Sequence, residues 1–503
     1  MKQKNSRNRL LCLLGLALFF TAPPLEKAWG IDYFAKPEFG GTCTQADPCY
    51  FVTAVNAAGN GDNVYFKQGI YYDNNFPTHV LYISKSVNLY GGWKGDLSWP
   101  LILRPDTYRS TLDGKDNRRV IYINGLITPT IEGFTITNGN ATNWATNCSG
   151  DNAKGCGGGI FVYRAGARIV NNKILDNKAH TITGESGYGG GIHLEEASGT
   201  IIRDNLIQGN QTNPLGGDGA GGGLSIYGPT QDMIRINGNQ FIGNNASMGG
   251  GISSGLLQNQ LVIYKNTFEN NNASRAAGLA LFYGENTISK NTFQNHQGQE
   301  TIFLAIFRGT FESNSIVSNN TNVGLYLPFG SPPFPRFSNN IIAGSGTKAI
   351  LALGSQQSPL FAKLEHNTLV GGGGGAAVSI PVNNNYVTLS LTNNIIAGFP
   401  VGVENSDPST STVNAGYTLF APDVTTPGVN VNFQNSLTGD PDFRNPASND
   451  FHIRLTSPAR DAGTTAIVST EDIDGDPRPI GSAPDIGADE FEAIYLFLPL
   501  IKR

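Results

Sequence analysis

The sequence has little charge, few cysteines and few histidines. Charged residues make up only 15% of the 503 residues, which is too few for a coiled coil. The 63 glycines do not follow the three-residue period of collagen, and a 10% share of aromatic residues argues against wholesale disorder. No Cys-x-x-Cys or His-Glu-x-x-His motif occurs, so no metal site of those types is predicted. What remains is the composition of a globular protein rich in strands and turns.

Residues 1–30 are predicted to be a secretory signal peptide. Four basic residues lie within the first nine, an apolar run covers 10–22, and 28–30 is a small-x-small cleavage site. The run is shorter than the roughly 20 residues of a membrane span, so no transmembrane span is expected after cleavage. The remaining chain has 29 basic and 38 acidic residues, a net charge of −9. Nothing in that balance points to nucleic acid or anionic lipid as a partner.

Four cysteines follow the predicted signal peptide, and they form two close pairs. Cys43 lies near Cys49, and Cys148 lies near Cys156. In an oxidising compartment each pair is expected to close a short loop as a disulfide. The competing interpretation, a metal site, has little support because the six histidines are scattered along the chain.

A repeat fills the middle of the chain. Three glycines followed by Ile or Leu begin at Gly157, Gly189, Gly221 and Gly249, at spacings of 32, 32 and 28 residues. A second column consists of Asn followed two residues later by Ile, Leu or Phe. Its members are Asn172, Asn205, Asn239, Asn266, Asn291, Asn314, Asn340, Asn367 and Asn394. A fixed period of this length is typical of solenoid architectures.

Short alternating apolar runs such as 160–163 and 192–195 predict strands with one buried face. One repeat is too short to bury a face alone, so the repeats are expected to stack as coils of an all-β parallel β-helix, a solenoid. The predicted inward column is Ile160, Ile192, Leu224, Ile252 and Leu279. Triple glycine fits a corner with positive φ, and the Asn column fits a ladder of side-chain amides.

The N-terminal coils carry a recognisable set of motifs, including Gly69-Ile70-Tyr71, Leu89-Tyr90-Gly91-Gly92-Trp93 and Leu112-Asp113-Gly114. These resemble right-handed parallel β-helix proteins of the pectin-lyase-like type. The resemblance implies a single-stranded right-handed parallel β-helix over residues 61–420. It also implies an N-terminal cap at 31–60 and a C-terminal cap at 421–492.

The C-terminal region carries a second set of motifs. They are Asp440–Phe443, Ser457–Gly463, Asp472–Arg478 and Asp485–Glu490, and they resemble the choice-of-anchor Q region of exported bacterial β-helix proteins. That resemblance implies surface or extracellular residence without an agreed activity. The apolar tail, residues 493–503, is interpreted either as a sorting signal or as a strand that pairs back onto the rod.

Enzymes of the resembled fold act on polysaccharides. Its lyases hold Ca²⁺ with clustered carboxylates, and its hydrolases need two carboxylates about 5–9.5 Å apart. This sequence has no Asp-Asp pair, no Gly-His-Gly and no Arg-x-Lys, which argues against a pectinase. Residues 472–476 resemble a calcium loop, but Ala483 stands where an EF-hand needs Glu. Two interpretations of this segment remain. It is either a Ca²⁺ site of another type or a charged turn in which Asp474 or Asp476 pairs with Arg478.

The longest insertions lie between residues 140 and 230, each before a triple glycine, so their loops are expected to stack on one side. The outward positions beside them form two columns: Phe161, His193, Ser225 and Ser253, then Tyr163, Glu195, Tyr227 and Gly255. Aromatic rings beside a carboxylate suit stacking on sugar rings. The predicted substrate-binding residues are Tyr163, His193, Glu196 and Tyr227. A solvated β-face without function is the alternative.

The leading interpretation is a monomeric exported or cell-surface β-helix protein whose face binds carbohydrate or another partner without catalysis. The partner would be a polysaccharide or a cell-envelope component. The alternative is a secreted polysaccharide lyase or glycoside hydrolase, with Glu195 as general acid or base and Asp218 as its partner. A purely structural rod of the cell envelope is the third possibility.

Overall fold

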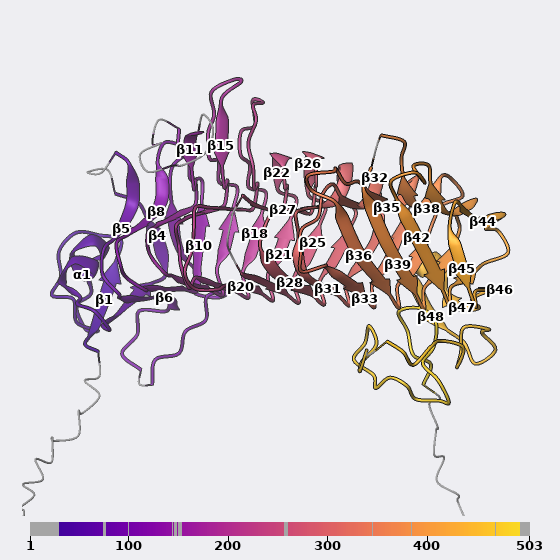
Figure 1. Ribbon diagram of the computed structural model, residues 1–503. Coiled ribbons are helices and arrows are strands. Elements are labelled where there is room, and N and C mark those ends of the chain that lie inside the picture. The colour runs from indigo at the N-terminus through magenta and orange to yellow at the C-terminus, as the bar shows by residue number, and fades with distance from the viewer. Residues whose placement is uncertain are drawn as a thin grey trace, which may run out of the picture.

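The computed structural model describes residues 30–492 except 74–76, 99, 143, 145–147, 149–152, 256–259, 345, 384 and 468. The predicted signal peptide lies outside this range apart from Gly30, and the apolar tail 493–503 lies wholly outside it. The described chain winds into an elongated rod of stacked coils (Figure 1). None of its helices is long and apolar enough to cross a membrane.

Three faces run along the rod. The first face is a 16-stranded sheet. Its strands are β1 (Asp32–Lys36), β2 (Cys49–Tyr50), β3 (Asn63–Lys67), β6 (Asn88–Trp93), β9 (Thr130–Glu132), β13 (Arg168–Val170), β17 (Ile201–Arg203), β20 (Ile234–Asn237), β24 (Leu261–Tyr264), β28 (Glu285–Ser289), β31 (Arg308–Glu312), β33 (Arg336–Ser338), β36 (Leu360–Glu365), β39 (Val387–Thr392), β42 (Thr412–Gly416) and β45 (Asn432–Gln434).

The second face begins at β4 and ends at β46. Its strands are β4 (Gly69–Tyr71), β7 (Ser110–Asp113), β10 (Phe134–Thr137), β14 (Lys173–Leu175), β18 (Leu206–Gln208), β21 (Gln240–Ile242), β25 (Thr267–Glu269), β29 (Thr292–Gln294), β32 (Ser315–Leu327), β34 (Ile341–Gly344), β37 (Thr368–Val370), β40 (Ile395–Ala397), β43 (Leu419–Phe420) and β46 (Leu437–Thr438). The long strand β32 continues from this face into the third, because it pairs with both β34 and β35.

The third face carries the candidate site. Its strands are β5 (His79–Ile83), β8 (Arg119–Asn124), β12 (Ile160–Tyr163), β16 (Ile192–Glu195), β19 (Leu224–Tyr227), β23 (Ile252–Ser254), β27 (Leu279–Phe282), β30 (Gln297–Ala305), β35 (Lys348–Ala352), β38 (Ala376–Ile380), β41 (Val401–Asn405) and β44 (Thr426–Val429). Four strands lie in the loops beside it: β11 (Ala153–Cys156), β15 (Ser186–Tyr188), β22 (Asn245–Met248) and β26 (Asn272–Arg275).

The coils stack in register, so the predicted parallel β-helix is confirmed. Ile160 pairs with Ile192, Ile192 with Leu224, Leu224 with Ile252, and Ile252 with Leu279. All five are fully buried in one continuous apolar core that runs along the coils. The alternating pattern of apolar residues predicts the buried face correctly because successive side chains of a strand point to opposite faces of the sheet.

The predicted Asn ladder is also present. Each amide donates to the side-chain oxygen of the next Asn, as Asn172 does to Asn205 at 3.1 Å and Asn205 to Asn239 at 2.9 Å. A second ladder, five residues further along each coil, was not predicted. It runs through Asn177, Asn210, Asn244, Asn271, His296 and Asn319. Both ladders satisfy buried backbone groups at the corners, which would otherwise be costly.

Glycine corners and disulfides complete the coil geometry. The first residue of each predicted triple glycine has positive φ, for example 61° at Gly157 and 64° at Gly189, as the corner requires. Both predicted disulfides are present, joining Cys43 to Cys49 and Cys148 to Cys156.

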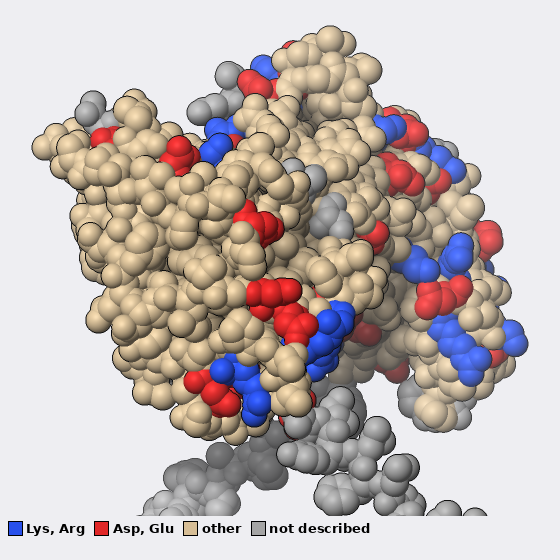
Figure 2. Space-filling model, turned by 90° about the vertical axis from the view of Figure 1, so that its right-hand side faces the viewer, with Lys and Arg blue, Asp and Glu red and all other residues tan. Residues whose placement is uncertain are grey.

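The two ends of the rod are built differently. The helix α1 (Phe51–Ala57) covers the first coils and buries Phe51 completely. At the other end the coils continue past the predicted boundary at residue 420, because β44, β45 and β46 still pair with the preceding coil. Figure 2 views the molecule from that end and shows broad areas without charged side chains.

Residues 440–492 lie beside the rod, against its second face (Figure 1). They contain β47 (Phe443–Asn445), the short 3-10 helix Pro446–Ser448 and β48 (Asp450–Ile453), and are otherwise irregular. Ile395 and Leu419 of the second face form a buried cluster with Ile453 and Ile486 of this segment. Hydrogen bonds such as that from Ala488 N to Thr368 Oγ1, at 3.0 Å, attach it along the coils.

Candidate functional site

A row of aromatic side chains marks the N-terminal part of the third face. Tyr82, Tyr122, Phe161 and His193 occupy the same register position on successive coils. Their ring centroids are 5.5, 5.3 and 5.3 Å apart, and Tyr122 lies nearly parallel to Phe161, at 13°. The same position carries Ser225, Ser253 and Ala280 in the next coils. This row of rings therefore ends at His193, and aromatic side chains return to the position further along the rod at Phe303 and Tyr326.

A pocket of about 400 Å³ opens at that end. Its walls come from α1, β5, β8 and the loop that holds Trp144. The lining residues are Val52, Val55, Asn56, Thr78, His79, Val80, Leu81, Tyr82, Arg119, Tyr122 and Trp144. Apolar walls with several rings and a few polar groups are typical of small-molecule sites.

Arg119 supplies the positive charge in this pocket. Its side chain is buried, with the guanidinium 5.4 Å from the Tyr122 ring centroid and 4.8 Å from that of Phe161. It donates to the carbonyl oxygens of Cys156 at 2.8 Å and Trp144 at 2.9 Å, so it links the aromatic row to the loops above. Burial lowers the pKa of Arg119 to about 10, which leaves it protonated at neutral pH.

His79 is the other titratable group of the pocket wall. Burial, followed by the positive charge of Arg119, lowers the pKa of His79 to about 4. Its Nδ1 lies 2.7 Å from Thr78 Oγ1. The imidazole is thus neutral at pH 7 and adds a polar edge to an otherwise aromatic wall.

The sequence-predicted residues His193 and Glu195 lie three coils from the start of the row. Alternation places them on the outer side, yet they are 0% and 1% exposed. His193 Nε2 is 3.2 Å from Glu195 Oε2, and burial lowers the pKa of His193. Tyr163 and Tyr227 flank Glu195 in register. Glu195 is therefore enclosed between neighbouring coils and has little access to solvent.

Glu196 and Asp218, two other predicted residues, take no part in this contact. Glu196 accepts a hydrogen bond from Arg164 at 2.8 Å at the surface. Asp218 lines a separate polar groove of about 540 Å³, together with Gln211, Thr212, Asn213, Asn245 and Ser247 among others, but Glu195 does not line it. The structure thus does not join Glu195 and Asp218 in one cavity. Near the groove, His180 Nε2 lies 2.8 Å from Glu185 Oε2.

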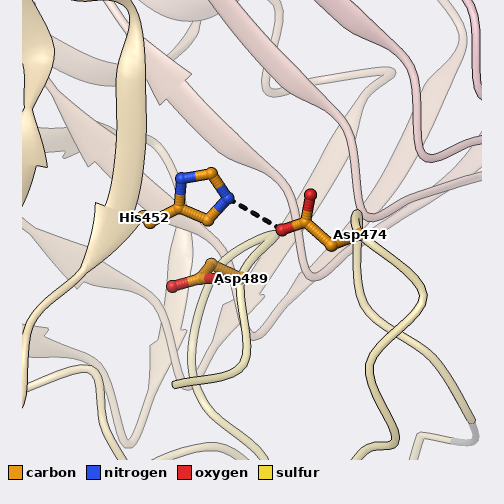
Figure 3. A group of neighbouring side chains, drawn as sticks. All are labelled: His452, Asp474 and Asp489. Carbon is orange, nitrogen blue, oxygen red and sulfur yellow. Dashed lines mark hydrogen bonds and ion pairs between the residues drawn. The ribbon is translucent and has the colours of Figure 1, made fainter. Parts of the chain in front are cut away.

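The C-terminal segment contains the one group of described side chains that combines His with carboxylates at metal-ligand spacing. Potential ligand atoms of His452, Asp474 and Asp489 lie within 4.8 Å of one another (Figure 3). His452 contacts Asp474 Oδ2 at 2.7 Å and Asp450 Oδ1 at 2.5 Å. Hydrogen bonding to Asp474 raises the pKa of His452 to about 9, so an imidazolium between two carboxylates accounts for the cluster without a metal.

The neighbouring turn, residues 472–476, was one of the places where sequence allowed Ca²⁺. Asp472 is fully buried, and its Oδ1 accepts from the backbone N–H groups of Asp474, Gly475 and Asp476, each at 2.9 Å. Its Oδ2 accepts from Glu490 N, also at 2.9 Å. Hydrogen bonds from the backbone N–H groups of the turn to the Asp472 carboxylate therefore hold the turn in place. The predicted pairing of Arg478 with Asp474 or Asp476 is wrong, because Arg478 pairs with Glu490 at 3.6 Å.

Sequence reasoning missed the pocket. Tyr82 and Tyr122 each stand at the outward position of an alternating strand, so extending the predicted column two coils toward the N-terminus would have found them. Trp144 and Arg119 could not have been placed this way, because their meeting depends on the path of an insertion.

The chain was compared with known families and structures. It matches the family described as "Right handed beta helix region" over residues 119–293 and 258–415, more than half of its length. The chain therefore belongs to this family, and its helix is right-handed. A comparison with curated proteins finds no match.

Three solved structures are similar to it. Pectate lyase Pel9A is 14% identical, with 92% of this chain and 96% of that one covered and a TM-score of 0.39. The catalytic unit of a GH87 alpha-1,3-glucanase from Streptomyces thermodiastaticus strain HF3-3 is 14% identical, with 74% and 69% covered and a TM-score of 0.39. XylC in complex with xylose is 12% identical, with 91% and 98% covered and a TM-score of 0.44. Likenesses this remote say nothing about substrate or reaction.

Proposed function

We propose that this protein is an exported β-helix that binds a saccharide in the pocket at the N-terminal end of its third face. The observation that carries the proposal is the meeting of Tyr82, Tyr122 and Trp144 in one pocket of about 400 Å³. Aromatic faces stack on the apolar face of a sugar ring, while neighbouring polar groups hydrogen-bond to its hydroxyls. His79, Thr78 and Asn56 supply such groups in the same wall.

Export is part of the proposal. It is supported by the basic and apolar pattern of residues 1–30 and by two disulfides, which persist in oxidising compartments. The resemblance of the C-terminal motifs to a choice-of-anchor Q region favours residence at the cell surface. The cell-envelope or extracellular polysaccharide would then be the natural partner.

Catalysis by Glu195 with Asp218 is the alternative, and it has weaker support. A general acid needs to reach the glycosidic oxygen, whereas Glu195 is 1% exposed and Asp218 lines another groove. A cleavage assay on the same polysaccharides separates the two. New reducing or unsaturated ends that disappear in Glu195→Gln would establish the enzyme.

The binding test uses a matched pair of tyrosines. Tyr82 is 41% exposed and lines the pocket, while Tyr283 is 37% exposed and does not. Residues 31–503 are screened against a polysaccharide panel, and the best ligand is titrated against both alanine variants. Tyr82→Ala is expected to weaken binding about two- to tenfold, as the loss of one ring contact implies, and Tyr283→Ala to leave it unchanged. Equal affinities for the two variants would refute the pocket.

A further inference from the structure

Three separate pieces of the C-terminal segment bring potential metal ligands to one point. His452 lies in β48, Asp474 in the turn 472–476 and Asp489 in the loop 485–490. Their potential ligand atoms, one imidazole nitrogen and two carboxylate oxygens, lie within 4.8 Å of one another (Figure 3). The side chains of His452 and Asp474 are 29% and 51% exposed, so an ion can reach them from solvent.

Hydrogen bonds between these pieces hold the three side chains in place. Asp489 Oδ2 accepts from Ile453 N at 2.7 Å, which ties the loop to β48. Asp472 accepts from three N–H groups of the turn through Oδ1 and from Glu490 N through Oδ2, which ties the turn that carries Asp474 to the loop. Ligands that are already fixed by their surroundings give a metal site its precision.

Asp450 stands where an outer-shell partner of a metal-bound histidine is usually found. It contacts Nδ1 of His452, while Nε2 lies 2.7 Å from Asp474 Oδ2. A carboxylate on one ring nitrogen orients the imidazole and leaves the other nitrogen for the metal. In the metal-free protein Nε2 carries the proton that bridges to Asp474. A metal ion would take the place of that proton, because only the unprotonated nitrogen coordinates.

We propose that His452, Asp474 and Asp489 bind one divalent transition-metal ion of the Zn²⁺ type, with water completing its coordination. One imidazolium balances only one of the three carboxylates around it, whereas a divalent ion balances two. A set of ligands that includes imidazole favours such an ion over Ca²⁺ and Mg²⁺, which prefer oxygen. The ion would join β48, the turn and the loop, and so stabilise residues 440–492 beside the rod. The proposal is independent of the saccharide pocket.

Isothermal titration calorimetry of untagged residues 31–503, freed of metal with a chelator, tests the site. One tight equivalent of Zn²⁺ is expected, bound at least about tenfold more strongly than Ca²⁺ or Mg²⁺. Because the metal replaces a proton, the affinity should rise with pH, and the measured heat should change with the ionisation enthalpy of the buffer. Excess Zn²⁺ should also slow proteolytic cleavage within residues 440–492, since it binds only the folded segment.

Variants assign the ligands. His452→Gln and Asp489→Asn each remove one ligand and should abolish the tight equivalent. Asp450→Asn removes only the outer-shell carboxylate and should weaken binding about 10- to 100-fold. Asp476→Asn is the matched control, because it changes a carboxylate of the same turn that lies outside the three ligands, and it should bind Zn²⁺ as tightly as the natural protein.

The remaining outcomes overturn the site. A titration without a tight Zn²⁺ equivalent, or with one that survives His452→Gln, would reject His452 as a ligand. Loss of binding in Asp476→Asn, or tighter binding of Ca²⁺ than of Zn²⁺, would place the ion at the carboxylates of the turn 472–476 instead. If Asp489→Asn does not fold, judged by far-UV circular dichroism, His452→Gln and the comparison of metals still decide.

Discussion

The two ends of the rod show how differently a β-helix can finish its coils. At the N-terminal end α1 lies across the first coils, with Phe51 and Ala54 fully buried, and the Cys43–Cys49 disulfide closes the adjoining loop. At the C-terminal end the last coil is exposed, with Val429 at 40%, Phe433 at 44% and Leu437 at 38%. One end is sealed by the chain, whereas at the other the strands are paired on one side only within residues 30–492.

The difference shows that a C-terminal segment need not seal the end it follows. After Thr438 the chain turns back beside the second face, where it covers outward-facing apolar side chains such as Ile395 and Leu419. This position buries apolar side chains of both the segment and the coils, and buried apolar area is the main source of stability. Polar residues such as Asn430, Asn432 and Asn435 lie in the exposed last coil, and they reduce the tendency of its open strand edges to pair with another chain.

Truncating one phenylalanine at each end is expected to give the largest contrast. Phe51→Ala removes a fully buried ring that packs edge-on against Tyr71 at 5.4 Å, and should cost about 3–5 kcal/mol of unfolding free energy. Phe433→Ala at the open end should change it by less than about 0.5 kcal/mol. All four tryptophans lie within residues 29–144, so tryptophan fluorescence in urea reports the N-terminal end, while far-UV circular dichroism follows the whole rod. A similar loss for both variants would mean that the open end is covered.

A smaller effect is expected from loosening the segment beside the rod. Asp472→Ala deprives four backbone N–H groups of their acceptor and should cost about 2 kcal/mol, since water can solvate some of them. Asp476→Ala, in the same turn, is the matched control and should be nearly neutral. Limited proteolysis should cut residues 440–492 faster in Asp472→Ala while the coils stay intact. Unfolding of the whole rod in step with the segment would show that the two are one cooperative unit.

The smallest effect is a pH dependence of opposite sign at the two ends. The pKa of His79 is lowered to about 4. Its contribution to the free energy of unfolding is therefore present above pH 6.5 and is lost as pH falls toward 4. The pKa of His452 is raised to about 9, so its contribution is present below pH 6.5 and is lost as pH rises toward 9. Burial raises the pKa of Asp489 to about 6, which acts in the same direction as His452.

The urea concentration at the midpoint of unfolding, measured between pH 4 and pH 9, tests whether the stabilities of the two ends change with pH in opposite directions. Tryptophan fluorescence should show the N-terminal end weakening toward acid, and proteolysis should show the C-terminal segment loosening toward alkaline pH. His79→Gln and His452→Gln should each flatten the trend at their own end alone. Parallel trends at both ends would contradict the assignment of either histidine.

Much of the rod could be predicted because its signals are local and repeated. Ile160 and Ile192 are inward for the same reason in each coil, and the Asn column predicts its own ladder because each amide bonds to its equivalent in the next coil. The second ladder was missed because His296 interrupts its Asn pattern. Glu195 could be placed on the outer side, but its burial could not, since the residues that enclose it come from neighbouring coils.

The class of fold, the inward column, the glycine corners and both disulfides could be predicted from the amino-acid sequence, because each depends on spacing within one repeat or one short loop. The position of the pocket, the burial of Arg119 among the described residues and the path of residues 440–492 along the rod depend on the tertiary structure. These features join α1, β5, β8 and an insertion, or a segment and coils more than a hundred residues away. No local pattern encodes such contacts, because they depend on how the completed coils bring distant side chains together.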